Sequence, residues 1–212
     1  MQKRKLVVIG NGMPQASFAK TSPALERRDG TLRVGMIARM NIRAKNQDSL
    51  LRAAARVTRK FPEVEFLLVG DGPFRGDLEK MAADLGIQRQ VRFLGDRRDV
   101  AAILASIDVS VVASASESLS NVMLESMAAA VPVVATAVGG NVELGGDGRA
   151  LMISPNNDDA LASTLERMLG DEKLRHEISG RARRFAEENF SLERIRDQYC
   201  ELYSDVSAGR TG

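Results

Sequence analysis

Residues 114–136 read SASESLSNVMLESMAAAVPVVAT, in which a turn, a helix and an apolar strand follow one another. An apolar run at residues 108–113 precedes this stretch and is expected to be a strand as well. The strand expected at residues 131–135 is apolar throughout and does not alternate with polar residues. Continuous apolar strands are typical of parallel sheets that are buried on both faces, so a parallel pair joined by a helix is predicted.

The same alternation of strand and helix runs along the chain. Amphipathic segments between the apolar runs predict helices, one ended by Pro62 and another capped by Gly86. We therefore expect an α/β fold with a Rossmann-like, doubly wound parallel sheet and right-handed crossovers. Ligands of such sheets bind beyond the carboxyl ends of the strands. The remaining strands are expected at residues 5–10, 32–38, 64–70, 91–94 and 150–153.

Composition and charge exclude several classes of protein. Of the 212 residues, 44% are hydrophobic, so a sizeable core is expected. The 30 basic and 28 acidic residues give a net charge of +2, which argues against a nucleic-acid partner. Cys200 is the single cysteine and fits a reducing compartment. No apolar run approaches the roughly 20 residues of a transmembrane helix, so we expect a cytoplasmic protein, free or peripheral at the inner face of the membrane.

The glycine pair near the N-terminus does not indicate a dinucleotide site. Gly10 and Gly12 begin a GxG pattern, but the third glycine of the dinucleotide-binding pattern would fall at Gln15. Pro14 also interrupts the stretch, and no helical pattern follows it. A Rossmann dinucleotide fingerprint at this position is therefore rejected.

Three cations follow the strand at residues 32–38, namely Arg39, Arg43 and Lys45. A guanidinium can bind two phosphate oxygens at once, and an ammonium adds a point charge. The three side chains are either an anion-binding loop at the carboxyl end of a strand or an ordinary solvated basic loop. Position alone leaves both interpretations open.

Two carboxylates, Glu117 and Glu125, lie eight positions apart around the start of the helix. Glu117 is expected in the turn and Glu125 about two turns into the helix, so that both face one cleft. A carboxylate only accepts hydrogen bonds, which suits the hydroxyls of a ribose, and a helix N-terminus suits a phosphate. Ordinary surface charge is the alternative, although the Met127–Ala130 run makes the helix apolar. The backbone N–H groups expected to open the helix are those of Leu119, Ser120, Asn121 and Val122.

Gly139 and Gly140 follow the strand at residues 131–135, within the sequence VGGNVE of residues 138–143. Two glycines allow the backbone to approach a ligand closely. An ordinary turn between a strand and a helix explains them equally well.

Several of these segments together resemble the family 4 (group 1) retaining glycosyltransferases. The resemblance rests on the two glutamates separated by seven residues, Glu117 and Glu125, and on the segments around them. It covers roughly residues 5 to 205. The matching segments occur in the order expected for the family's C-terminal domain: residues 34–39, 69–73, 91–95, 108–114, 117–128, 131–136 and 138–143.

This resemblance implies the C-terminal, donor-binding half of a GT-B fold, in which two Rossmann-like domains face a cleft. Residues 1–31 are then a hinge strand and a linker, and residues 32–190 the domain that binds the sugar nucleotide. Residues 191–206 resemble the helix that crosses back onto the N-terminal domain, and residues 207–212 are expected to be a disordered tail. Without its N-terminal half the chain is expected to bind the donor weakly and to transfer nothing.

The resemblance also assigns roles to residues. Glu117 contacts the donor sugar and Glu125 the ribose, while Arg39 and Lys45 neutralise the diphosphate in the transition state. Because five residues separate these two cations where about four are expected, Arg43 is a candidate to share or take the role of Arg39. Further donor contacts are expected from the helix amides of residues 119–122, from Leu94 and Gly95 near the base, and from Gly139. Ala130 and Ser118 depart from the family, which often has glycine at both positions.

No cofactor and no metal ion is expected, and His176 is expected to have no catalytic role. The expected partners are a UDP-, GDP- or ADP-sugar donor, the N-terminal GT-B domain and a glycan or lipid-linked acceptor. An apolar stripe on the last helix predicts self-association, and its residues are Leu192, Ile195, Tyr199, Leu202 and Val206. A sugar-nucleotide 2-epimerase of the same architecture is one alternative function, and a non-catalytic nucleotide- or protein-binding module is another.

Overall fold

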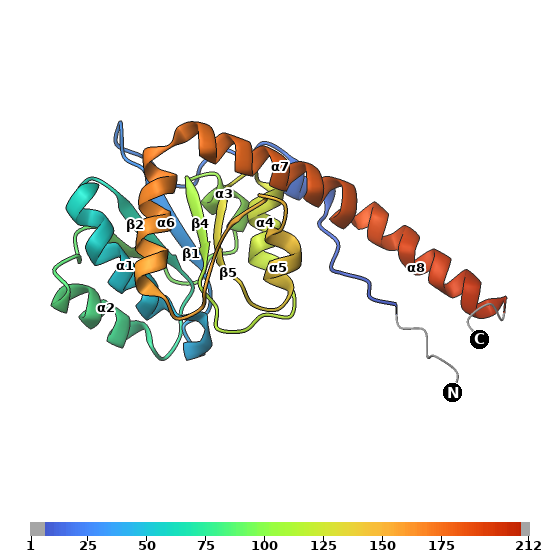
Figure 1. Cartoon of the computed structure of the whole chain (residues 1–212), viewed down its shortest axis with the longest axis horizontal. Coiled ribbons are helices and arrows are strands. Elements are labelled where there is room, and N and C mark those ends of the chain that lie inside the picture. The colour runs from blue at the N-terminus through green and yellow to red at the C-terminus, as the bar shows by residue number, and fades with distance from the viewer. Residues whose placement is uncertain (1–6, 209–212) are drawn as a thin grey trace.

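Figure 1 shows the computed structural model of the chain, in which residues 7–208 are described. Parallel strands form one six-stranded sheet in the order β3-β2-β1-β4-β5-β6. This order reverses between β1 and β4, which is the doubly wound arrangement. The predicted fold class is therefore confirmed. The strands are β1 (Arg33–Ile37), β2 (Glu65–Val69), β3 (Val91–Phe93), β4 (Val109–Val112), β5 (Val133–Thr136) and β6 (Leu151–Ile153).

Helices cover both faces of the sheet. Successive strand residues point to opposite faces, so Phe66 and Leu68 enter one core layer whereas Leu67 and Val69 enter the other. The first layer is covered by α1 (Gln47–Lys60), α2 (Arg75–Asp84) and α6 (Asp158–Gly170). The second is covered by α3 (Val100–Leu104), α4 (Asn121–Ala128) and α5 (Gly140–Gly145).

Two helices follow the sheet, α7 (Glu172–Phe190) and α8 (Leu192–Ser207). α7 contributes Ile178 to the first core layer and Ala186 to the second, so it joins the two layers. The Ser191 hydroxyl between the two helices accepts a hydrogen bond from the Arg194 amide at 3.3 Å, which is the N-cap that the sequence predicted. Figure 1 shows α8 extending away from the sheet.

The apolar stripe predicted on the last helix is largely exposed to solvent. Within α8, Ile195 is the buried residue. Of the other stripe residues, Leu192, Tyr199 and Val206 are exposed and Leu202 is half-buried. Tyr203, beside the stripe, is also exposed, and its ring stacks on that of Tyr199 with the centroids 6.3 Å apart. The sheet core therefore leaves most of this helix uncovered.

The prediction of a strand at residues 5–10 is wrong for the residues that the structure describes. Residues 7–10 form no strand, and Val7 and Val8 are exposed; Lys5 and Leu6 lie outside the described residues. A short apolar run becomes a buried strand only where it pairs with a neighbour, and β3 and β6 are the outer strands of the sheet. The segment instead runs beside the junction of α7 and α8.

The expectation that residues 13–31 form a linker also needs correction, because much of this stretch packs on the domain. Met13 and Phe18 are buried in the second core layer, and a short 3-10 helix covers Gln15–Phe18. Ala24 and Leu25 pack on the cluster formed by α3 and β2. The polar composition of this stretch concealed the four apolar side chains that hold it in place.

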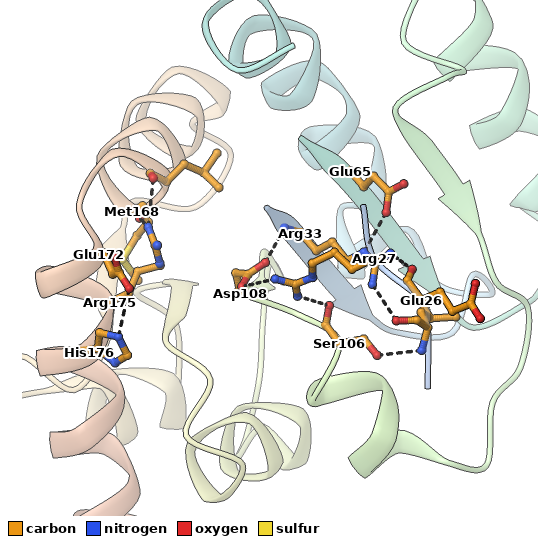
Figure 2. A network of polar contacts seen from close by, with 12 residues as sticks. Glu26, Arg27, Arg33, Glu65, Ser106, Asp108, Met168, Glu172, Arg175 and His176 are labelled. Atoms are coloured by element: carbon orange, nitrogen blue, oxygen red, sulfur yellow. Dashed lines mark hydrogen bonds and ion pairs between the residues drawn. The ribbon is translucent and has the colours of Figure 1, made fainter. Parts of the chain in front are cut away.

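A buried arginine fastens the end of the same stretch to the sheet (Figure 2). Arg33, only 1% exposed, donates from Nε to Glu65 Oε2 at 2.8 Å and from its terminal nitrogens to the carbonyl oxygens of Leu25 and Glu26. Its backbone amide donates to Asp108 Oδ2 at 2.7 Å. A buried guanidinium is tolerated only when its donors are paired, and backbone carbonyls supply most of the pairing here. Sequence reasoning missed this network because carbonyl partners leave no mark in the sequence.

Candidate functional site

A crevice opens at the carboxyl ends of β1 and β4, between which the strand order reverses. This is the position at which open α/β sheets bind ligands. The cavity there has a volume of about 200 Å³. Lining residues come from the end of β1, the following loop, the end of β4 and the start of α4: Met36, Ile37, Ala38, Lys45, Val111, Val112, Ser114, Glu117, Leu119, Ser120, Asn121 and Val122.

Lys45 and Glu117 form an ion pair across this cavity. Lys45 Nζ lies 2.5 Å from Glu117 Oε1, and the Ser114 hydroxyl donates to the same oxygen at 2.7 Å. The two loops that carry the pair are also joined through their backbones, since the Ala115 amide donates to the Ala44 carbonyl at 2.7 Å. The pair is therefore held by the loops that follow two neighbouring strands, and it places one cation and one carboxylate at the switch point.

The helix that borders the cavity starts later than the sequence indicated. α4 begins at Asn121, because the Ser120 hydroxyl accepts a hydrogen bond from the Met123 amide at 3.3 Å and so forms the N-cap. The first amides of a helix have no intrahelical partner and carry partial positive charge. Asn121 and Val122 therefore present the unpaired amides of α4 to the cavity, whereas Leu119 lies in the preceding loop.

Glu125 lies in the second turn of α4, is partly buried and is not among the residues that line the switch-point cavity. Desolvation by burial raises the pKa of its carboxyl above the ordinary value. Within residues 7–208, its side chain has neither a hydrogen bond nor an ion pair. The structure thus does not bring Glu125 into contact with Glu117, and it leaves the Glu125 carboxylate in need of a donor.

The other two cations of the loop after β1, Arg39 and Arg43, do not line the cavity that Lys45 lines. Arg39 is exposed, and within residues 7–208 its one hydrogen bond is through the carbonyl, which accepts from Gln47 Nε2 at 3.0 Å. The guanidinium of Arg43 lies over the Phe74 ring, 4.6 Å from the centroid, and lines a separate cavity between α1 and α2. Arg43 is thus engaged away from the switch point, and Arg39 is not among the residues that line the switch-point cavity. A role of Arg39 beside Lys45 stays a prediction.

Gly139 and Gly140 approach another loop of the protein closely. A Cβ on Gly139, whose φ is +46°, would lie 1.7 Å from the Glu117 carbonyl oxygen. The Gly140 amide donates to the Ser118 carbonyl at 3.1 Å. The two glycines are thus required for packing against the loop that carries Glu117. This packing explains their small size without a ligand. A contact between Gly139 and a ligand stays a prediction.

Leu94 and Gly95, expected near the base, follow β3 and do not line the switch-point cavity. The Gly95 carbonyl accepts from the Gly70 amide at 2.8 Å, which holds the loops after β2 and β3 together. Gly95 adopts a φ of +65° and lies beside Arg75 and Asp71, which are themselves hydrogen-bonded at 3.0 Å. Their role toward a base stays a prediction.

The described residues contain no cluster of acidic, cysteine or histidine side chains that could hold a metal ion. His176 lies on α7, exposed, with Nε2 3.6 Å from Glu172 Oε1. Across residues 7–208, no helix combines the length and the apolar character that crossing a bilayer requires.

The comparison with protein families matches residues 31–171 to the model described as "Glycosyl transferases group 1". The chain belongs to this family. Among curated relatives, the lipopolysaccharide core biosynthesis glycosyltransferase LpsE of Rhizobium meliloti is 36% identical over 162 residues, covering 76% of this chain and 46% of LpsE. The D-inositol 3-phosphate glycosyltransferase of Corynebacterium urealyticum is 31% identical over 225 residues, covering 96% of this chain and 52% of that protein.

Solved structures of group 1 glycosyltransferases and their neighbours agree with the fold. Anabaena HepE in complex with UDP and glucose has a TM-score of 0.84 and 30% identity, covering 93% of this chain and 56% of HepE. The C-terminal domain of LpcC from Francisella tularensis matches over 100% of its length and 85% of this chain, with a TM-score of 0.74 and 23% identity. The chain thus has the C-terminal Rossmann-like half of a GT-B fold, and it spans about half the length of the curated relatives it matches.

Proposed function

We propose that this chain is the donor-binding half of a retaining glycosyltransferase of the hexosyltransferase type. The observation that carries the proposal is the Lys45–Glu117 ion pair beside the first amides of α4, at the switch point of a doubly wound sheet. The UDP complex of Anabaena HepE supports a nucleotide-sugar donor for this chain. The family supports transfer of a sugar to a glycan or a lipid-linked acceptor.

The donor diphosphate is proposed to lie between Lys45, Arg39 and the amides of Asn121 and Val122. The bond between the anomeric carbon and the diphosphate oxygen breaks during transfer, and negative charge collects on the departing nucleoside diphosphate. Cations and oriented N–H groups that are already in place stabilise that charge more than they stabilise the intact donor. The ion pair with Glu117 holds Lys45 at this position before the donor arrives. With two cations in this role, the proposed transfer requires no metal ion.

The two carboxylates are proposed to bind hydroxyl groups. Glu125 accepts hydrogen bonds from the ribose hydroxyls, which replace the water that burial has removed from its carboxylate. Glu117 contacts the donor sugar through the carboxylate oxygen that Lys45 does not occupy. Gly139, Leu94 and Gly95 are proposed as further contacts to the sugar and the base.

The acceptor site is proposed to lie on an N-terminal Rossmann-like half that faces the crevice. The acceptor hydroxyl forms the new bond to the anomeric carbon on the face from which the nucleoside diphosphate leaves, so the configuration is retained. The hydroxyl proton passes to the departing diphosphate. A cytoplasmic location, free or peripheral at the membrane, is proposed as well.

Calorimetric titration with UDP-, GDP- and ADP-sugars tests the donor site. We expect binding to one nucleotide class in the micromolar to millimolar range, weakened about tenfold or more by Lys45→Ala or Glu125→Ala, because each removes a charged hydrogen-bond partner. Arg43→Ala is the matched control, since it removes a cation from the same loop that faces Phe74 instead of the cavity. The proposal fails if no nucleotide binds at millimolar concentration, or if Lys45→Ala and Arg43→Ala bind alike.

The alternatives separate in the same experiment. A 2-epimerase would convert the sugar of its donor, which NMR of the recovered nucleotide detects, whereas the donor-binding half should return the donor unchanged. A non-catalytic module would be indifferent to Glu125→Ala. Transfer of a sugar by the chain alone, onto any added glycan or lipid acceptor, would contradict the need for an N-terminal half.

A further inference from the structure

Residues 10–13 are fastened to the junction of α7 and α8. The Met13 amide donates to the Phe190 carbonyl at 2.6 Å, and the Leu192 amide donates to the Met13 carbonyl at 2.9 Å. A Cβ on Gly12 would lie 3.0 Å from the Leu192 backbone, so the segment packs closely against the first turn of α8. These bonds fix the position of the backbone on both sides of Asn11.

The same segment touches the loop that leads into the donor site. A Cβ on Gly10 would lie 3.6 Å from the Leu119 side chain. The Asn11 side chain donates from Nδ2 to Asn121 Oδ1 at 2.7 Å, across 110 residues of sequence. Asn121 is the first residue of α4 and lines the switch-point cavity. A segment outside the sheet thus holds a side chain of the site.

The direction of this hydrogen bond determines what Asn121 can offer a ligand. An asparagine amide carries one acceptor oxygen and two donor hydrogens. The Asn11 donor occupies the acceptor oxygen of Asn121, and within residues 7–208 no protein acceptor bonds its Nδ2 group. The unpaired end of the Asn121 amide is therefore a donor, which suits an anion. An amide turned the other way would present its oxygen and repel one.

We propose that Asn11 is a positioning residue for the diphosphate, acting through Asn121. Its side chain keeps the Asn121 oxygen occupied, so that the Asn121 Nδ2 group joins the Asn121 and Val122 backbone amides at the amino end of α4. Asn11 itself touches no donor atom. This inference rests on the proposed donor site, and it adds a residue from outside the domain core to the groups that recognise the diphosphate.

Titration of the 212-residue chain with UDP tests the inference. Asn11→Ala is expected to weaken UDP binding about 3- to 10-fold, the range of one lost hydrogen bond. Asn11→Asp is expected to weaken it further, because a carboxylate cannot donate to the Asn121 oxygen and adds negative charge near the phosphates. Asn189→Ala is the matched control, since Asn189 is an exposed asparagine whose side chain, within the part of the chain that the structure describes, donates to the Phe185 carbonyl of its own helix and to nothing else. Thermal unfolding should be the same for all four proteins within about a degree.

A double-mutant cycle separates positioning from a merely structural role. If Asn11 acts through Asn121, then Asn11→Ala has no further effect in a chain that already carries Asn121→Ala. Losses that add overturn the proposal, as does unchanged UDP affinity in Asn11→Ala. No UDP binding by the unsubstituted chain would overturn the donor site itself and this inference with it. UDP binding that depends on Lys45 and not on Asn11 would overturn this inference alone.

Discussion

At the scale of the single residue, one glutamate of the site has polar partners and the other has none within residues 7–208. Glu117 is paired with Lys45 and accepts a hydrogen bond from Ser114. Glu125 has lost water to burial and has gained no partner within residues 7–208. A carboxylate of this second kind destabilises the folded chain while it is ionised, and it gains most from a ligand that donates hydrogen bonds.

Glu125→Gln should therefore stabilise the chain and weaken ligand binding. The folded-state pKa of Glu125 is raised above its ordinary value of 4.5, so the folded state binds the proton more tightly than the unfolded state does. Stability is lost as pH rises from the ordinary pKa through the raised one, and the full penalty applies at pH 7. We expect Glu125→Gln to raise the melting temperature by about 1 to 4 °C at pH 7 and to have no effect near pH 4, as measured by calorimetry.

The control for this prediction is Glu143→Gln, because Glu143 is exposed and its neutralisation should leave the melting temperature unchanged at both pH values. A gain for Glu125→Gln that is equal at pH 4 and pH 7 would show that the substitution acts through packing and not through charge. A loss of stability at pH 7 would mean that the ionised carboxylate has a stabilising partner.

At the scale of the element, the carboxyl end of α4 carries a strained residue. Ala130 adopts a φ of +56°, a left-handed conformation that glycine adopts at little cost. The Val131 amide donates to the Ser126 carbonyl at 2.8 Å and the Ala130 amide to the Met127 carbonyl at 3.0 Å, which closes the helix end around this residue. The strain gives a physical reason for the glycine that the resemblance leads one to expect where this chain has Ala130.

Ala130→Gly is expected to stabilise the chain. A left-handed conformation costs an alanine roughly 1 kcal/mol or more, and glycine removes most of that cost while losing some entropy on folding. The melting temperature should rise by about 1 to 3 °C in a thermal unfolding experiment. Ala129→Gly is the matched control, because Ala129 has a φ of −77° and should lose stability on the same substitution. Equal changes for the two variants would contradict the argument from φ.

At the scale of the whole molecule, α8 is an apolar surface with little cover. Leu192, Tyr199, Tyr203 and Val206 are exposed along a helix that extends from the sheet. The chain spans about half of its curated relatives, and the resemblance to the family implies that an N-terminal half packs against this helix. When the 212 residues are studied alone, the exposed side chains are open to a second copy.

Sedimentation should therefore show self-association that increases with protein concentration. Tyr203→Glu is expected to shift the chain toward the monomer by about tenfold in the association constant, since it puts a charge beside the stripe at the most exposed tyrosine of α8, which is 66% exposed. Glu201→Gln, an exposed change beside the stripe, is the control. A monomer at all concentrations for the unsubstituted chain would contradict the prediction.

The fold could largely be predicted from local patterns. Apolar runs identified β1, β2, β4 and β5 to within a few residues, and Ser191 and Gly86 were recognised as helix caps. The N-terminal run at residues 5–10 was predicted wrongly, because an apolar run shows that a segment can be a strand and says nothing of whether a strand edge is free to pair with it. The packing of residues 13–31 was missed for a related reason, since carbonyl oxygens and scattered apolar side chains hold that stretch.

The structure brings together Glu117, Lys45 and the start of α4, which the sequence placed after neighbouring strands. Their role toward a donor stays a prediction. Which side chains face the cavity, and where α4 begins, depend on contacts with groups that are distant in the sequence or compete locally. Arg39 and Arg43 are indistinguishable in the sequence, and the Phe74 ring that draws Arg43 away lies thirty-one positions further along the chain. The Ser120 side chain caps α4, so the helix begins at Asn121 and Leu119 lies in the preceding loop. Asn11 gave no signal, because its partner lies 110 residues away.

The sequence by itself determined the alternation of strands and helices, the family and the residue types at the carboxyl ends of the strands, because these depend on patterns that repeat over a few positions. The tertiary structure alone decided which of those residues meet. Lys45 and Glu117 are 72 positions apart and lie at 2.5 Å, because β1 and β4 pair side by side and end at one edge of the sheet. Glu125, about one turn into α4, lies outside the cavity that Lys45 lines and has no partner within residues 7–208.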